Sequence, residues 1–136
     1  MLTMSSLNAA PAAGDVLQTE QIKLLAEIAF AATGRKDYAR AETIFQSLLV
    51  LRPERDFPYL GLGINYLNAG RALDAILILE KGRKMAPDSP DLAVFLALAL
   101  RNTKRNGEAA KLLAEVLAKH PEDTPILRMA KEMQVS

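Results

Sequence analysis

The segment DFPYLGLGINYLNAGRALDAILILEKGRKMAPDS (residues 56–89) contains two blocks in which apolar residues recur at three- and four-residue steps. This spacing is typical of one face of an α-helix. The first block ends near Gly70 and the second ends before Pro87. Glycine commonly follows the last turn of a helix, and the residue before a proline disfavours helical conformation. The segment therefore predicts two helices joined by a turn.

The same pattern continues on both sides of this segment with a period of 34 residues. Four sets of positions share this period: Pro53, Pro87 and Pro121; Ala41, Ala75 and Ala109; Phe45, Leu79 and Leu113; and Ala29, Gly63 and Ala97. Agreement between four independent sets is very unlikely to arise by chance. The sequence thus predicts three repeats, at about residues 22–55, 56–89 and 90–123.

Each set of repeated positions has a physical role. The small residues let the two helices of a repeat pack closely. The larger apolar residues, such as Phe45, fill the space between adjacent repeats. Each proline ends a second helix. Ser89–Pro90 and Thr124–Pro125 then start new helices, as an N-cap residue followed by a first-turn proline.

A helix–turn–helix unit of this length resembles the tetratricopeptide repeat, and the resemblance runs over about residues 19–133. It implies an all-α fold, an α-solenoid of three tetratricopeptide helix–turn–helix repeats closed by a C-terminal capping helix at residues 124–134. We expect one domain over residues 16–136, after a flexible leader at residues 1–15. The chain departs from the family at the turn glycine, because Gly70 has Lys36 and Lys104 as its counterparts.

Gly61 and Gly63 look at first like part of a phosphate-binding loop. They lie inside a predicted helix, the spacing is not the dinucleotide fingerprint, and no P-loop lysine follows. Gly63 is the small packing residue of the repeat. Gly61 costs roughly 1 kcal/mol relative to alanine in a helix interior. It either lets a ligand backbone approach or is simply tolerated.

The composition excludes several classes of function. The formal net charge is +1, which gives no electrostatic reason to expect nucleic acid or an anionic membrane as a partner. The chain has no cysteine, so disulfides, thiolate catalysis and cysteine-based zinc sites are excluded. The longest apolar run, residues 92–100, is too short to cross a membrane, and residues 1–19 lack a basic segment. We therefore expect a cytoplasmic protein without membrane insertion.

The sequence offers little for catalysis. His120 is the only histidine and has no obvious partner. Asp88 and Asp91 flank Ser89–Pro90, where helix capping explains them better than paired-carboxylate chemistry. We expect no enzyme activity, no cofactor and no metal site.

The resemblance implies that the first helix of each repeat lines a concave groove, which would be the partner-binding site. The groove positions are Ala26, Phe30, Phe57, Leu60, Ile64, Leu67, Asn68, Val94, Leu98, Arg101 and Asn102. Most are apolar, and a large exposed apolar patch usually marks a binding site. We expect an apolar peptide or helix of a client protein there, while Leu62, Gly63 and Tyr66 pack inside. Alternatively, the leader or a homodimer partner covers the groove.

Some tetratricopeptide co-chaperones hold a C-terminal carboxylate with Lys and Asn side chains on the first helices. The corresponding positions here are Ala26, Phe30, Gly61, Asp91 and Phe95. The clamp is absent, so docking to Hsp70 or Hsp90 in that manner is not expected.

The segment IAFAATGRKDYARAETIFQSLLVLRPERDFPYLGLG (residues 28–63) resembles the small three-repeat chaperones of bacterial type III secretion, a virulence machinery. The shared features are AF before the first turn, FQ-x-L-x-x-L in the next helix, and LGLG opening repeat two. The resemblance implies a cytosolic chaperone that holds an apolar segment of a translocator or needle protein until export. The alternative is a structural assembly adaptor that uses the repeats for stable homo- or hetero-oligomer contacts.

Overall fold

The computed structural model describes residues 11–136, with side chains from residue 18 onward. The described part contains helices and no strand. Its helices are α2 (Pro11–Gly34), α3 (Tyr38–Leu51), α4 (Phe57–Asn68), α5 (Ala72–Met85), α6 (Pro90–Asn102), α7 (Asn106–Lys119) and α8 (Pro125–Val135). Helix α2 begins at Pro11, so residues 11–15 of the predicted leader belong to it. Residues 1–10 of the predicted leader lie outside the described residues, so the flexible leader stays a prediction.

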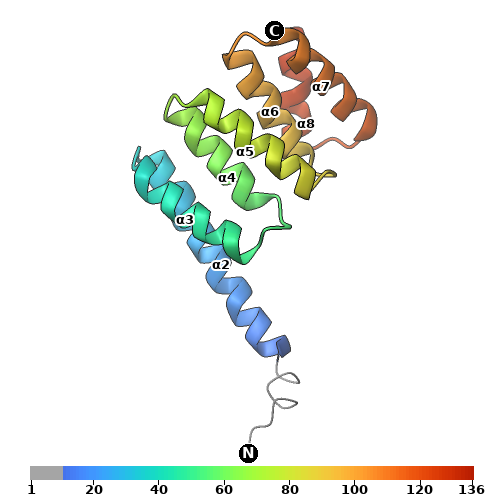
Figure 1. Cartoon of the computed structure of the whole chain (residues 1–136). Coiled ribbons are helices and arrows are strands. Elements are labelled where there is room, and N and C mark those ends of the chain that lie inside the picture. Colours follow the sequence, from blue (N-terminus) through green and yellow to red (C-terminus); the bar gives the residue numbers. More distant parts are fainter. Residues whose placement is uncertain (1–10) are drawn as a thin grey trace, which may run out of the picture.

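The helices form three consecutive pairs, α2 with α3, α4 with α5 and α6 with α7, as Figure 1 shows. The first helices of successive pairs, α2, α4 and α6, also contact one another, and α8 packs against both α6 and α7. This arrangement confirms the all-α solenoid of three repeats with a capping helix. None of the helices in the described part is both long enough and apolar enough to span a membrane.

The turn inside each repeat has the same backbone geometry despite different residues. Gly70 has a φ of 78°, and its counterparts Lys36 and Lys104 have φ angles of 66° and 65°. In each turn the next residue donates its N–H to a carbonyl five residues back, as from Arg71 to Tyr66 at 2.8 Å. This is the bond of a Schellman motif, which needs a left-handed residue. The turn is therefore retained, with lysine in a conformation that favours glycine.

The core depends on close contact at two glycines, Gly61 between the first two repeats and Gly63 within the second repeat. A Cβ atom added to Gly61 would overlap the Phe45 ring, and one added to Gly63 would lie 2.5 Å from Leu79 Cδ2. Gly61 is therefore neither an approach site for a ligand nor merely tolerated. It leaves space for a ring from the preceding repeat. Leu62, Gly63 and Tyr66 are buried, as predicted.

Candidate partner-binding groove

The predicted partner-binding residues all lie on the first helices of the three repeats, α2, α4 and α6. Most of them expose part of their surface. Phe30, Asn68 and Asn102 are exposed, and seven are partly buried: Ala26, Phe57, Leu60, Ile64, Leu67, Leu98 and Arg101. That these residues bind a partner stays a prediction. Their exposure leaves most of them accessible to one, and the exceptions are described below.

A pocket of about 270 Å³ lies between α2 and the loop from α3 to α4. It brings together three predicted residues, Ala26, Phe30 and Phe57. The Phe30 ring meets the Phe45 ring edge-on, with centroids 4.8 Å apart. The same Phe45 ring rests on Gly61, so packing between repeats fixes one wall of the pocket.

On α4, three predicted residues differ in how far they belong to the core. Leu60 and Leu67 are partly buried and pack against the core cluster, whereas Ile64 is partly buried but stands apart from it. Ile64 is therefore the position at which a substitution tests the groove with the least damage to the fold.

Val94 is a wrong prediction. Its side chain is 0% exposed, so it belongs to the core and does not line an open groove. Helix α6, which carries Val94, contacts four other helices, α4, α5, α7 and α8. The repeat pattern alone places Val94 on the inner face and takes no account of how closely these helices surround α6.

Arg101 is committed to an internal contact. Its guanidinium donates to the carbonyl oxygen of Met133 at 3.1 Å and to the hydroxyl of Ser136 at 3.0 Å. Both acceptors are at the C-terminal end of α8, where unpaired carbonyl groups favour a cation. Arg101 thus holds the capping helix in place, a role that the sequence analysis missed.

A buried polar cluster joins the first two repeats. Asn65 is 1% exposed, and its amide donates to the Tyr38 carbonyl at 3.1 Å. The Thr33 hydroxyl donates to the Asn65 side-chain oxygen at 2.8 Å. The sequence analysis did not single these residues out, although two polar side chains on otherwise apolar helix faces are a usable signal. Every buried polar atom of this cluster has a hydrogen-bond partner, so the cluster stabilises the contact between the first two repeats.

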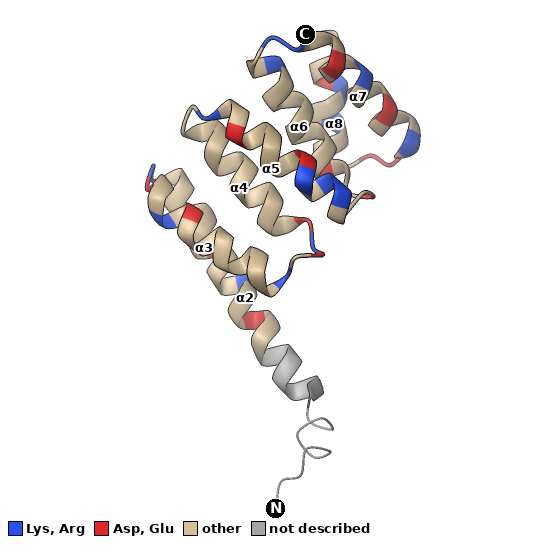
Figure 2. Ribbon diagram, viewed as in Figure 1, with Lys and Arg blue, Asp and Glu red and all other residues tan. Residues whose placement is uncertain are grey.

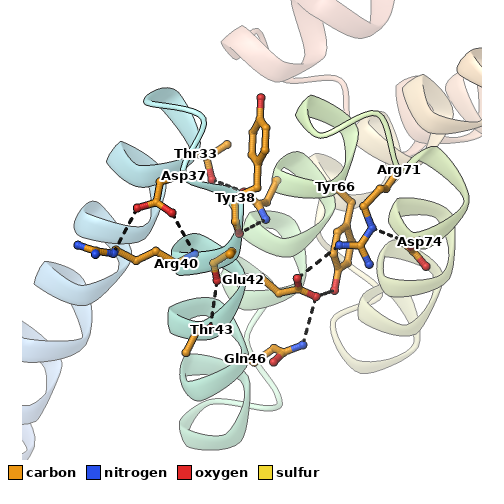
Figure 3. Close-up of polar contacts among 12 residues, drawn as sticks. Thr33, Asp37, Tyr38, Arg40, Glu42, Thr43, Gln46, Tyr66, Arg71 and Asp74 are labelled. Carbon is orange, nitrogen blue, oxygen red and sulfur yellow. Dashed lines mark hydrogen bonds and ion pairs between the residues drawn. The ribbon is translucent and has the colours of Figure 1, made fainter.

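Figure 3 shows a second polar cluster, which links α3 to α4 and α5. The Tyr66 hydroxyl donates to Glu42 at 2.6 Å, and the Arg71 guanidinium lies 4.5 Å from the centre of the Tyr66 ring. Arg71 also pairs with Asp74 at 2.8 Å and with Glu42 at 3.4 Å. Burial, together with the hydrogen bond to Glu42, raises the pKa of Tyr66 to about 12. The phenol is therefore neutral at ordinary pH and serves packing.

The N-cap residues of α6 and α8 are the ones that the sequence analysis predicted, Ser89 and Thr124. The hydroxyls of Ser89 and Thr124 accept the N–H groups of Leu92 and Leu127, which caps α6 and α8. Burial raises the pKa of Asp91, with a further contribution from nearby Asp56.

His120 is also explained by the local structure, because it is the C-cap residue of α7. Its ring nitrogen Nδ1 lies 3.6 Å from Glu122. In the part of the chain that the structure describes, no three His, Cys, Asp or Glu residues gather in a metal-binding group.

Comparison with solved structures shows the same fold in secretion chaperones. The translocator chaperone SycD of Yersinia enterocolitica matches with a TM-score of 0.77 and 24% identity, over 91% of this chain and 95% of SycD. A second SycD structure, an alternative dimer, matches with a TM-score of 0.74 and 26% identity, over 85% and 90%. PcrH in complex with the chaperone binding region of PopB matches with a TM-score of 0.72 and 20% identity, over 84% and 94%.

Sequence comparison agrees at the level of the family. No curated protein sequence matches the chain. The model of the tetratricopeptide repeat matches residues 66–133, half of the chain. With the period, the paired helices and the left-handed turns, this match shows that the chain belongs to the tetratricopeptide repeat family.

Proposed function

We propose that the protein is a non-enzymatic binding module, a type III secretion chaperone that holds an apolar segment of a translocator or needle protein in its concave groove. The observation that carries this proposal is the row of partly exposed apolar side chains on the inner helices, from Phe30 and Phe57 at the pocket to Ile64 on α4. Covering an apolar client segment lowers the concentration of a surface that would otherwise aggregate.

The structural likeness supports the proposal through fold. SycD is a translocator chaperone, and PcrH binds the chaperone binding region of PopB. Both share this array of repeats over most of their length. By analogy, the chain would act in the cytoplasm, where a client waits before export.

Co-expression in the native host, followed by affinity capture and mass spectrometry, tests this function. The expected result is stoichiometric capture of a secreted protein with an apolar segment. Capture must be lost with Ile64→Asp and retained with a matched change on an outer helix, Leu77→Asp. Capture that is equal for both variants would place the client elsewhere.

A structural assembly adaptor is the second candidate, and the open end of the array favours it. Leu24, Leu25 and Ile28 on α2 are 57%, 37% and 40% exposed. One period later, Tyr59 and Leu62 occupy the positions of Leu25 and Ile28 and are buried. A second copy of the chain could cover this exposed apolar face of α2, as a preceding repeat would.

The two candidates differ in how molecular mass depends on concentration. An adaptor that works by self-association gives a dimer without any client, and Ile28→Glu converts it to a monomer. A chaperone with a free groove captures its client whether or not Ile28 is changed. Light scattering and the capture assay on the same variant separate the two.

A further inference from the structure

The pocket of the first repeat has a basic rim. Besides Ala26, Phe30 and Phe57, its lining includes Lys23 on α2 together with Arg52 and Arg55 from the loop region between α3 and α4. No carboxylate lines it. The pocket therefore combines an apolar floor with three positive charges on its edge.

These cations are not neutralised inside the described part of the chain. There, no carboxylate lies within ion-pair distance of Lys23, Arg52 or Arg55. Arg52 donates one guanidinium N–H to the Leu51 carbonyl at 2.8 Å, and the Arg55 guanidinium lies 5.9 Å from the centre of the Phe57 ring.

Arg55 has an acidic residue on each side in the sequence, Glu54 and Asp56, and neither lines the pocket. Asp56 follows Arg55 directly, and its carboxylate accepts a hydrogen bond from the Ser89 hydroxyl at 2.7 Å. It thus serves the contact with the third repeat. The three cations of the basic rim therefore stay available to a ligand.

The rim belongs to a gradient of charge along one edge of the array. The position of Lys23 is occupied by Phe57 in the second repeat and by Asp91 in the third. At the other end, a pocket between α6 and α8 is lined by Asp91 and Glu122 along with apolar side chains. Figure 2 shows the charged positions along the loops at this edge. The net charge of +1 is a sum over the whole chain and does not report this local difference between the two pockets.

We propose that the pocket of the first repeat binds a client segment in which an apolar side chain is flanked by Asp or Glu. The apolar side chain enters between Ala26, Phe30 and Phe57, and the carboxylate meets the rim cations. Arginine forks form short, charge-assisted hydrogen bonds to carboxylates, so the rim selects among apolar segments. This inference rests on the proposed function and specifies which clients that groove accepts.

The chain's own N-terminal segment does not fit this description. Residues 1–14 contain no acidic side chain, and the first is Asp15. A separate client carrying an acidic residue beside its apolar anchor is the better occupant on charge.

A random-peptide display selection on the full chain supplies the probe. Selected sequences are expected to contain an apolar residue with Asp or Glu within two positions. Each selected peptide is then synthesised in two forms, one with its acidic residues and one with Asn or Gln in their place, and both are titrated by fluorescence polarisation. The acidic form is expected to bind about tenfold more tightly at low salt. The difference should shrink as salt rises, because added ions screen exposed charges over about 10 Å at 0.1 M.

Charge-reversal variants locate the effect. Lys23→Glu/Arg55→Glu should remove the preference for the acidic form and leave binding of the amide form nearly unchanged. Lys23→Gln/Arg55→Gln should give an intermediate result. Lys81→Glu/Lys84→Glu on α5 makes the same charge change at exposed positions outside the pocket and should preserve the preference. Circular dichroism confirms that each variant is folded.

The outcomes separate this inference from the proposed function. Equal binding of acidic and amide peptides, both sensitive to Ile64→Asp, would overturn the acidic preference and leave the groove as the binding site. A preference that survives Lys23→Glu/Arg55→Glu would also overturn it. Selection of no peptide at all would overturn both proposals.

Discussion

Gly61 shows how one missing side chain permits contact between two repeats. The Phe45 ring of the first repeat occupies the space that a Cβ atom on Gly61 would need, and the same ring supports Phe30 at the pocket. The helix accepts the conformational cost of glycine in return for this contact. A stability determinant and the wall of the candidate site therefore meet at one position.

Gly61→Ala should lower the free energy of unfolding by about 1–3 kcal/mol, since the added methyl group overpacks the interface between repeats. Urea denaturation measures it. Gly107→Ala is the matched control, because a Cβ atom there meets nothing within 4 Å. That variant should be unchanged or slightly stabilised, by up to about 1 kcal/mol. Equal effects at the two glycines would contradict the role of the Phe45 ring.

The raised pKa of Tyr66 predicts that the free energy of unfolding changes at high pH. Its pKa is raised from the ordinary value of 10.0 to about 12, so the folded state favours the neutral phenol. The contribution of this phenol to stability is present below pH 10 and is lost as the pH rises through about 12. The free energy of unfolding should fall more steeply over that range in the native chain than in Tyr66→Phe. Parallel curves for the two proteins would argue against the Tyr66–Glu42 hydrogen bond.

At the scale of elements, α8 engages one of the predicted inner-face residues. It packs against α6, and its C-terminal end accepts a hydrogen bond from Arg101, so the guanidinium of Arg101 serves the capping helix instead of the groove. The helix itself could be predicted from Thr124–Pro125 and the repeat period. Its contacts could not, because they join residues about one repeat apart and depend on how the last helix lies against α6.

Arg101→Ala should loosen α8 and lower the free energy of unfolding by about 1–2 kcal/mol, since two hydrogen bonds to the end of that helix are lost. Hydrogen exchange of the α8 amides should speed up first. Arg105→Ala removes only an exposed pair with Glu108 on the same helix and should cost less than about 0.5 kcal/mol. Unchanged amide hydrogen exchange in α8 would contradict this role and leave Arg101 as a predicted groove residue.

At the scale of the whole molecule, the 34-residue period predicts the pairing of helices, their order and the buried faces of Leu62 and Tyr66. It also places Phe30, Phe57 and Ile64 on the inner helices. Three features could be found only in the structure. They are the Phe45 ring that explains Gly61, the buried hydrogen bond between Thr33 and Asn65, and the basic rim of the first pocket. The first two arise where side chains from different repeats converge, and the third arises where cations from α2 and from the loop after α3 face one pocket. A periodic pattern does not specify such contacts.

Ile64→Asp is the sharpest test of the groove as a binding surface. Ile64 is partly exposed and stands apart from the core cluster, so the charged side chain reaches water in the free protein. Helicity and melting temperature should therefore stay close to those of the native chain. A bound client would bury the same carboxylate without a partner, which costs several kcal/mol, and each 1.4 kcal/mol is a tenfold loss of affinity.

Client capture should accordingly be lost with Ile64→Asp and kept with Leu77→Asp, which introduces the same charge at a side chain that is 67% exposed on α5. Circular dichroism and affinity capture are measured on the same samples. A variant that unfolds would place Ile64 in the core or in an oligomer contact and would favour the assembly adaptor. A folded variant that still captures the client would show that the client does not bury residue 64 and would contradict binding along this face of α4.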